Sequence, residues 1–101
     1  MTGDQEAQEI LRLVTAGIFQ MTRHALERSY GRNISRAEVS HCAKHCTRHE
    51  WQEVQQTHLF IGHLNRHETG GFTAVLRDGA VVLTVFRRRL TKWEKKRAKR
   101  F

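Results

Sequence analysis

Proline is absent from the 101 residues, and cysteine occurs only twice, as Cys42 and Cys46. The absence of proline argues against a proline-rich linker or a collagen-like segment. Two cysteines cannot supply the disulfide framework of a small secreted domain. No apolar run approaches the ~20 residues that a membrane-spanning helix needs, and the acidic, polar N-terminus is unlike a signal peptide. We therefore expect a single domain over residues 1–101, without a membrane span, in a reducing cytoplasm.

Acidic residues are scarce in one segment in particular. The chain has 18 Lys and Arg against 10 Asp and Glu, a net charge of +8. Residues 87–101 hold a single acid, Glu94, so this segment carries the whole excess and the preceding residues sum to zero. Its nine bases are Arg87, Arg88, Arg89, Lys92, Lys95, Lys96, Arg97, Lys99 and Arg100.

Blocks of like charge are often interaction tails. A polyanion is the natural partner, because binding releases the counterions condensed on its phosphates. The nine bases are therefore predicted to bind nucleic acid. Two alternatives are a solvated tail that aids solubility and contact with an anionic membrane surface, to which Trp93 and Phe101 would add a narrow apolar face.

The N-terminal half has the pattern of helices. Apolar residues from Ile10 to Met21 recur at helical spacing, which predicts a helix near residues 4–16. The pattern continues to Leu26, so one long helix and two shorter ones are both possible. After a break at Gly31 and Asn33, a capping box of Ser35 and Glu38 predicts a further helix, from Arg36 to about Arg48.

The C-terminal half changes to a pattern typical of strands. Residues 57–64, 72–76 and 81–86 are rich in β-branched and aromatic side chains. Asp78-Gly79 lies between the last two and predicts a tight hairpin turn, because both residues tolerate positive φ. A second capping box, Thr91 with Glu94, predicts a short basic helix from Lys92 to about Lys99. The predicted class is α+β: N-terminal helices packed on an antiparallel sheet, followed by this basic helix.

Three short motifs occur in order along the chain. Residues 22–28 read T-R-H-A-L-E-R, residues 32–35 read R-N-I-S, and residues 82–87 read V-L-T-V-F-R after the Asp78-Gly79 turn. This set resembles the pattern T-x-H-A-x-x-R, R-x-I-S and V-x-T-V-[YF]-R of a family of small toxin-like proteins. That family belongs to the ribonuclease superfamily that includes barnase, RelE and the tRNA-cutting colicins. The resemblance covers residues 20–40 and 72–88, and it implies one or two helices on a four- or five-stranded antiparallel sheet and metal-independent cleavage of RNA.

The residues in these motifs suit that chemistry. An imidazole can take or give a proton near neutral pH, and a guanidinium matches the geometry of phosphate oxygens. His24 and Arg28 are four residues apart and share one face of a helix, so they are predicted as acid–base group and phosphate clamp. Thr84 is the predicted positioning group, and Tyr30 is a weaker candidate for contact with the leaving group. Because side chains alternate along a strand, Thr84 faces away from Arg87 unless the strand bends or ends near Phe86. The alternative is that these residues have no catalytic role: His24 and Arg28 would form an ordinary exposed helix face, and Thr84 would be present as a β-forming residue.

A second cluster lies in the predicted helix 36–48. His41, His45 and His49 would share one face, with Cys42 and Cys46 on the adjacent stripe. Imidazole and thiolate ligands suit zinc, but the spacing is not that of a known zinc motif. We favour buried cysteines and solvated or RNA-facing histidines, hence no metal and no cofactor; His41 or His45 could also supply a second catalytic imidazole.

The sequence thus predicts a metal-independent endoribonuclease that uses the 2′-hydroxyl of RNA as nucleophile, as a toxin or a phage-encoded effector. Its partners would be RNA and an acidic cognate inhibitor or host protein. The alternatives are a non-catalytic module that binds nucleic acid or protein and a zinc-stabilised interaction domain. Trp51 is expected in the core or at its edge, and Trp93 is the better candidate for stacking on bases.

Overall fold

The computed structural model describes residues 2–92, which form three helices and one five-stranded mixed sheet. The predicted α+β class is confirmed, whereas the predicted basic helix lies outside the described residues apart from Lys92. The elements in chain order are α1 (Gly3–Thr15), β1 (Phe19–Met21), α2 (Arg23–Gly31), α3 (Arg36–Lys44), β2 (Cys46–Gln52), β3 (Thr57–His63), β4 (Glu68–Leu76) and β5 (Ala80–Arg89). The strands lie side by side in the order β1-β5-β4-β3-β2.

The long apolar pattern of the N-terminus divides into two helices with a strand between them. α1 ends before Gly17, whose φ of 79° is a backbone conformation that glycine adopts without strain. β1 follows and pairs in parallel with β5, Phe19 opposite Ala80 and Met21 opposite Val82. The prediction of a wholly antiparallel sheet is therefore wrong at this edge. The three residues of β1 are too few to show a period of two within a helical pattern.

α3 begins where its capping box predicts but ends early. The Ser35 hydroxyl accepts from the Glu38 amide, and the Glu38 carboxylate accepts from the Ser35 amide. The helix stops at Lys44, and Cys46–Gln52 pairs with β3 as β2. The prediction of a helix to about Arg48 is thus wrong, because pairing with β3 outweighs the local helical preference. His49 consequently lies on a strand, and the predicted three-histidine helix face does not form.

The predicted hairpin between β4 and β5 is confirmed. Asp78 and Gly79 both have positive φ, 52° and 116°. Further along the same pair, Thr73 lies opposite Thr84 but Ala74 lies opposite Val82, so β5 has a bulge at the residue between. As a result Val82 and Val85 are both buried, although they are an odd number of residues apart.

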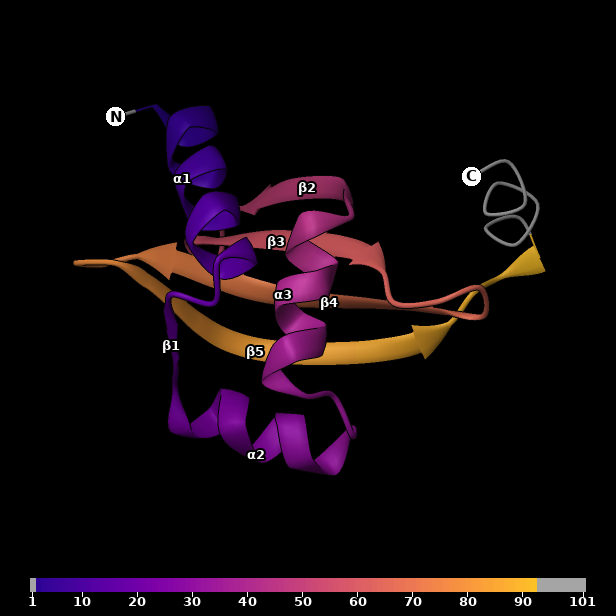
Figure 1. Cartoon of the computed structure of the whole chain (residues 1–101). Helices are drawn as coiled ribbons and strands as arrows, with labels where there is room; N and C mark the ends of the chain where they lie inside the picture. Colours follow the sequence, from indigo (N-terminus) through magenta and orange to yellow (C-terminus); the bar gives the residue numbers. More distant parts are fainter. Residues whose placement is uncertain (1, 93–101) are drawn as a thin grey trace.

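Figure 1 shows how the helices are arranged around the sheet. α1 and α3 lie over one face of β3, β4 and β5, where a core including Ile10, Val39, Phe60, Phe72 and Val82 is buried. α2 lies beside β5, at the edge of the sheet that β1 begins. The opposite face of the sheet carries none of the described helices, and we call it the open face. Among residues 2–92, no helix is long and apolar enough to cross a membrane.

Candidate functional site on helix α2

α2 brings His24 and Arg28 onto one face, as their spacing predicts. The helix is fixed at its start by Thr22, whose hydroxyl accepts from the Ala25 amide at 3.1 Å and donates to the Leu83 carbonyl of β5 at 3.1 Å. Ala25 is fully buried on the inner side of the helix. The outer side is hollowed over a volume of about 480 Å³, lined by His24, Glu27, Arg28, Gly31 and Arg32.

The hollow on α2 has the charge that a phosphate requires. It contains two guanidiniums, Arg28 and Arg32, and one carboxylate, Glu27, which pairs with Arg23 at 3.5 Å. His24 is exposed beside them. An exposed imidazole next to two cations can exchange a proton with a ligand whose phosphate the guanidiniums hold.

Thr84 lies elsewhere. Its side chain belongs to the open face, opposite Thr73 of β4, and it does not line the hollow on α2. The Thr22 hydroxyl donates to the carbonyl of Leu83, the residue before Thr84. α2 therefore begins close to Thr84 in space, although the strand register places the Thr84 side chain on the open face. Tyr30 is 84% exposed on α2 and also lies outside the lining of the hollow.

Arg87 differs from the other predicted phosphate-binding cations. It faces the helix-covered side, where its Nε and Nη2 donate to the Glu68 carboxylate at 3.0 and 2.9 Å and Nη1 lies 3.4 Å from Glu38. Nη1 also donates to the Asn33 carbonyl just after α2. Hydrogen bonds from Arg87 hold the pKa of the Glu68 carboxyl below its ordinary value. Arg87 therefore joins β5 to β4, α3 and the end of α2.

The other described cations of the segment, Arg88, Arg89 and Lys92, are exposed. Lys95, Lys96, Arg97, Lys99 and Arg100, together with Trp93, lie outside the described residues.

The two cysteines are free thiols in hydrophobic surroundings. Burial raises the pKa of the Cys42 thiol to about 12 and also raises the pKa of Cys46. The protonated thiol is a poor nucleophile and a poor metal ligand. The rings of His41 and His45 lie 4.4 Å apart at the end of α3. Within residues 2–92, no group of three His, Cys, Asp or Glu side chains is arranged to hold a metal ion.

Sequence reasoning missed a histidine pair between β2 and β3. His49 Nε2 lies 2.9 Å from Nδ1 of His58, which is buried against Phe60 and Trp51. Burial, and then the neighbouring His49, lower the pKa of His58. The pair depends on the pairing of β2 with β3, which no local signal predicts. It lies at the far edge of the sheet from α2, so it does not supply a second imidazole to the hollow there.

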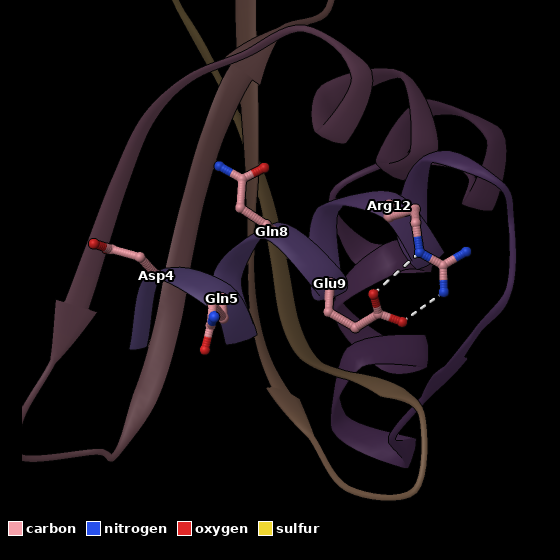
Figure 2. Close-up of a pocket in the computed structure, with 5 residues that line it drawn as sticks. All are labelled: Asp4, Gln5, Gln8, Glu9 and Arg12. Atoms are coloured by element: carbon pink, nitrogen blue, oxygen red, sulfur yellow. Dashed lines mark hydrogen bonds and ion pairs between the residues drawn. The ribbon is translucent and has the colours of Figure 1, made fainter. Parts of the chain in front are cut away.

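A larger hollow, of about 910 Å³, lies along the outer side of α1 (Figure 2). Its lining is Asp4, Gln5, Gln8, Glu9 and Arg12. The guanidinium of Arg12 is engaged by Glu9, with Nε donating to Oε2 at 3.1 Å. The lining offers neither an imidazole nor an unengaged cation, so it suits RNA chemistry less well than the hollow on α2.

Comparison with protein-family models, with curated proteins and with solved structures found no match.

Proposed function

We propose that the protein binds RNA and cleaves it without a metal, and that the hollow on α2 is the reaction site. The observation that carries the proposal is the placement of His24 in one hollow with Arg28 and Arg32. The resemblance of the three motifs to small toxin-like ribonucleases points to the same residues. A toxin or phage-encoded effector acting in a reducing cytoplasm agrees with two free cysteines.

The chemistry needs few groups. His24 removes the proton of the 2′-hydroxyl, whose oxygen attacks the adjacent phosphorus. Arg28 and Arg32 stabilise the charge that develops on the phosphoryl oxygens. The bond between phosphorus and the 5′-oxygen breaks, and that oxygen takes up a proton from water as it leaves. The products are an RNA with a 2′,3′-cyclic phosphate and an RNA with a free 5′-hydroxyl.

A non-catalytic RNA-binding module is the second candidate. It is favoured by two observations: the hollow on α2 contains a single imidazole, and Thr84 lies outside it. A site that lacks a second proton donor can hold RNA and leave it intact. Such a module would use the same exposed cations to bind RNA or an acidic protein, including a cognate inhibitor or a host protein.

Incubation of the purified protein with total RNA in EDTA tests the proposal. We expect fragments that end in 2′,3′-cyclic phosphate, because the mechanism needs no metal. The His24→Ala variant, purified in the same way, controls for contaminating nucleases. Intact RNA that is nevertheless bound by the wild-type protein would reject catalysis and support the non-catalytic module.

A further inference from the structure

One aromatic side chain on the open face of the sheet packs against the backbone of a neighbouring strand. Phe86 of β5 is paired with Gly71 of β4, which is paired with Ile61 of β3. A side-chain carbon at position 71 would collide with Cζ and Cε1 of the Phe86 ring, so the ring rests on the backbone of β4 where a glycine makes room. Phe86 is only partly buried, because none of the described helices covers this side.

The surroundings of Phe86 are mixed in a way that suits nucleic acid. The next row across the strands is Glu50, Leu59, Thr73 and Thr84, in which the two threonines supply hydroxyls beside the ring. On the other side of Phe86 the row ends in Arg88. An apolar partner would take water away from the Thr73 and Thr84 hydroxyls. A nucleotide offers a base to the ring, hydroxyls and ring nitrogens to the threonines, and a phosphate to the arginine.

The open face is also continuous with the basic segment. β5 presents Thr84, Phe86 and Arg88 on this face and then leads directly into residues 90–101, which hold six of the nine bases. The charge complementarity therefore favours RNA over a second copy of this basic chain.

We propose that Phe86 is a stacking platform for a base of single-stranded RNA on the open face of the sheet. The inference rests on the proposed function in one respect, namely that RNA is the partner. It adds a binding site separate from the hollow on α2 and gives Thr84 a role there. Thr73 and Thr84 contact the edge of the stacked base or its ribose, while Arg88 contacts the neighbouring phosphate.

The test compares wild type, Phe86→Leu and Trp51→Leu for binding of a 2′-O-methyl oligouridylate, which cannot be cleaved through its 2′-oxygen. Trp51 is the matched control, an aromatic residue 45% exposed on the other face of the sheet. Loss of one stacked base weakens binding by about 5- to 100-fold. We expect this loss in Phe86→Leu alone, with an unchanged slope of log affinity against log salt, because stacking releases no counterions.

An abasic oligonucleotide of the same length sharpens the test. Phe86→Leu and wild type should bind it equally, because only the base contacts the ring. Phe86→Trp keeps the stacking surface and should bind the oligouridylate as wild type does. Equal affinity of Phe86→Leu and wild type for the oligouridylate would overturn the inference while leaving the proposed function intact.

The inference can also be tested if Phe86→Leu does not fold or if the wild type forms a dimer. If Phe86→Leu does not fold, photocrosslinking of 5-iodouridine RNA to the wild-type chain replaces it: a crosslink at Phe86 supports the inference, and crosslinks only at other residues overturn it. A wild-type dimer that Phe86→Leu dissociates would show that a second copy occupies the open face, which also overturns it. Failure of the wild type to bind any RNA would reject the proposed function itself.

Discussion

The hollow on α2 and the open face of the sheet lie in neighbouring parts of the molecule and differ in almost every property. The hollow is polar and charged, with one imidazole and two guanidiniums supplied by α2 and the residue that follows it. The open face presents the Phe86 ring, apolar side chains and hydroxyls of β3, β4 and β5, with the Arg48–Glu50 ion pair of β2 on one side and Arg88 on the other. The first suits proton transfer at a phosphate, and the second suits the binding of a base. Under the two proposals, chemistry and base binding would be divided between two surfaces, which meet where α2 lies against β5.

The largest expected effect is on the rate of RNA cleavage, and it comes from a change in the hollow on α2 alone. His24→Ala should lower the rate of RNA cleavage by about 10²- to 10⁴-fold, the usual cost of one acid–base group. Its affinity for the uncleavable oligouridylate should match that of wild type, because the ring on the open face is unchanged. Phe86→Leu should do the opposite in a parallel assay: it should weaken binding of the oligouridylate and keep the rate of cleavage at saturating RNA.

His67→Ala is the control for His24→Ala, since His67 is another exposed histidine, in the turn between β3 and β4. It should leave both cleavage and binding unchanged. Wild-type cleavage by His24→Ala would remove the hollow on α2 from the mechanism.

The basic segment offers the next largest effect. Deletion of residues 92–101 removes six bases, Lys92, Lys95, Lys96, Arg97, Lys99 and Arg100. Binding should weaken for all RNA sequences alike, and the slope of log affinity against log salt should fall by ~0.7 for every phosphate that these bases neutralise in the intact chain. The cleavage positions within a given RNA should stay the same, because backbone contacts position the chain without reading its sequence.

Phe86→Leu gives the comparison for this deletion, since it should lower affinity at constant slope. A slope equal to that of the intact chain after the deletion would show that the segment does not touch phosphate. The basic residues would then serve solubility or an acidic protein partner.

Local signals explain which parts of the fold the sequence could predict. The Ser35–Glu38 capping box and the Asp78-Gly79 turn act within four residues, and both are found where the sequence predicts them. β1 and β2 were missed because they exist only through their partners. β1 has three residues next to β5, and β2 is a largely exposed, charged strand whose pairing with β3 cannot be seen in its own pattern.

The same distinction between local and long-range signals applies to the candidate site. His24 and Arg28 meet because helical spacing is a local rule, and the sequence alone predicts their common face. The separation of Thr84 from them depends on the sheet, and the Phe86–Gly71 contact depends on the register between β4 and β5. Arg87 was predicted as a phosphate-binding cation because its partners Glu38 and Glu68 are distant in sequence.

Arg87 gives the smallest expected effect and tests the connection between the two surfaces. Arg87→Met removes the hydrogen bonds to Glu68 and to the Asn33 carbonyl that hold the end of α2 beside β5. The free energy of unfolding should fall by about 1 kcal/mol, since these bonds are partly exposed to water. For a domain of this size that change lowers Tm by about 4–8 °C. The salt slope of RNA binding should not change, because the guanidinium is already engaged by two carboxylates.

Arg89→Met is the matched control, an exposed arginine two residues further along the same strand. Its effect on stability should stay within about 0.5 kcal/mol, while removal of its charge from a phosphate would lower the salt slope by ~0.7. Thermal unfolding and RNA titrations at several salt concentrations measure both quantities on the same samples. A normal Tm with a reduced slope for Arg87→Met would mean that Arg87 leaves Glu68 to bind phosphate, and that Arg87 is not needed to hold α2 beside β5.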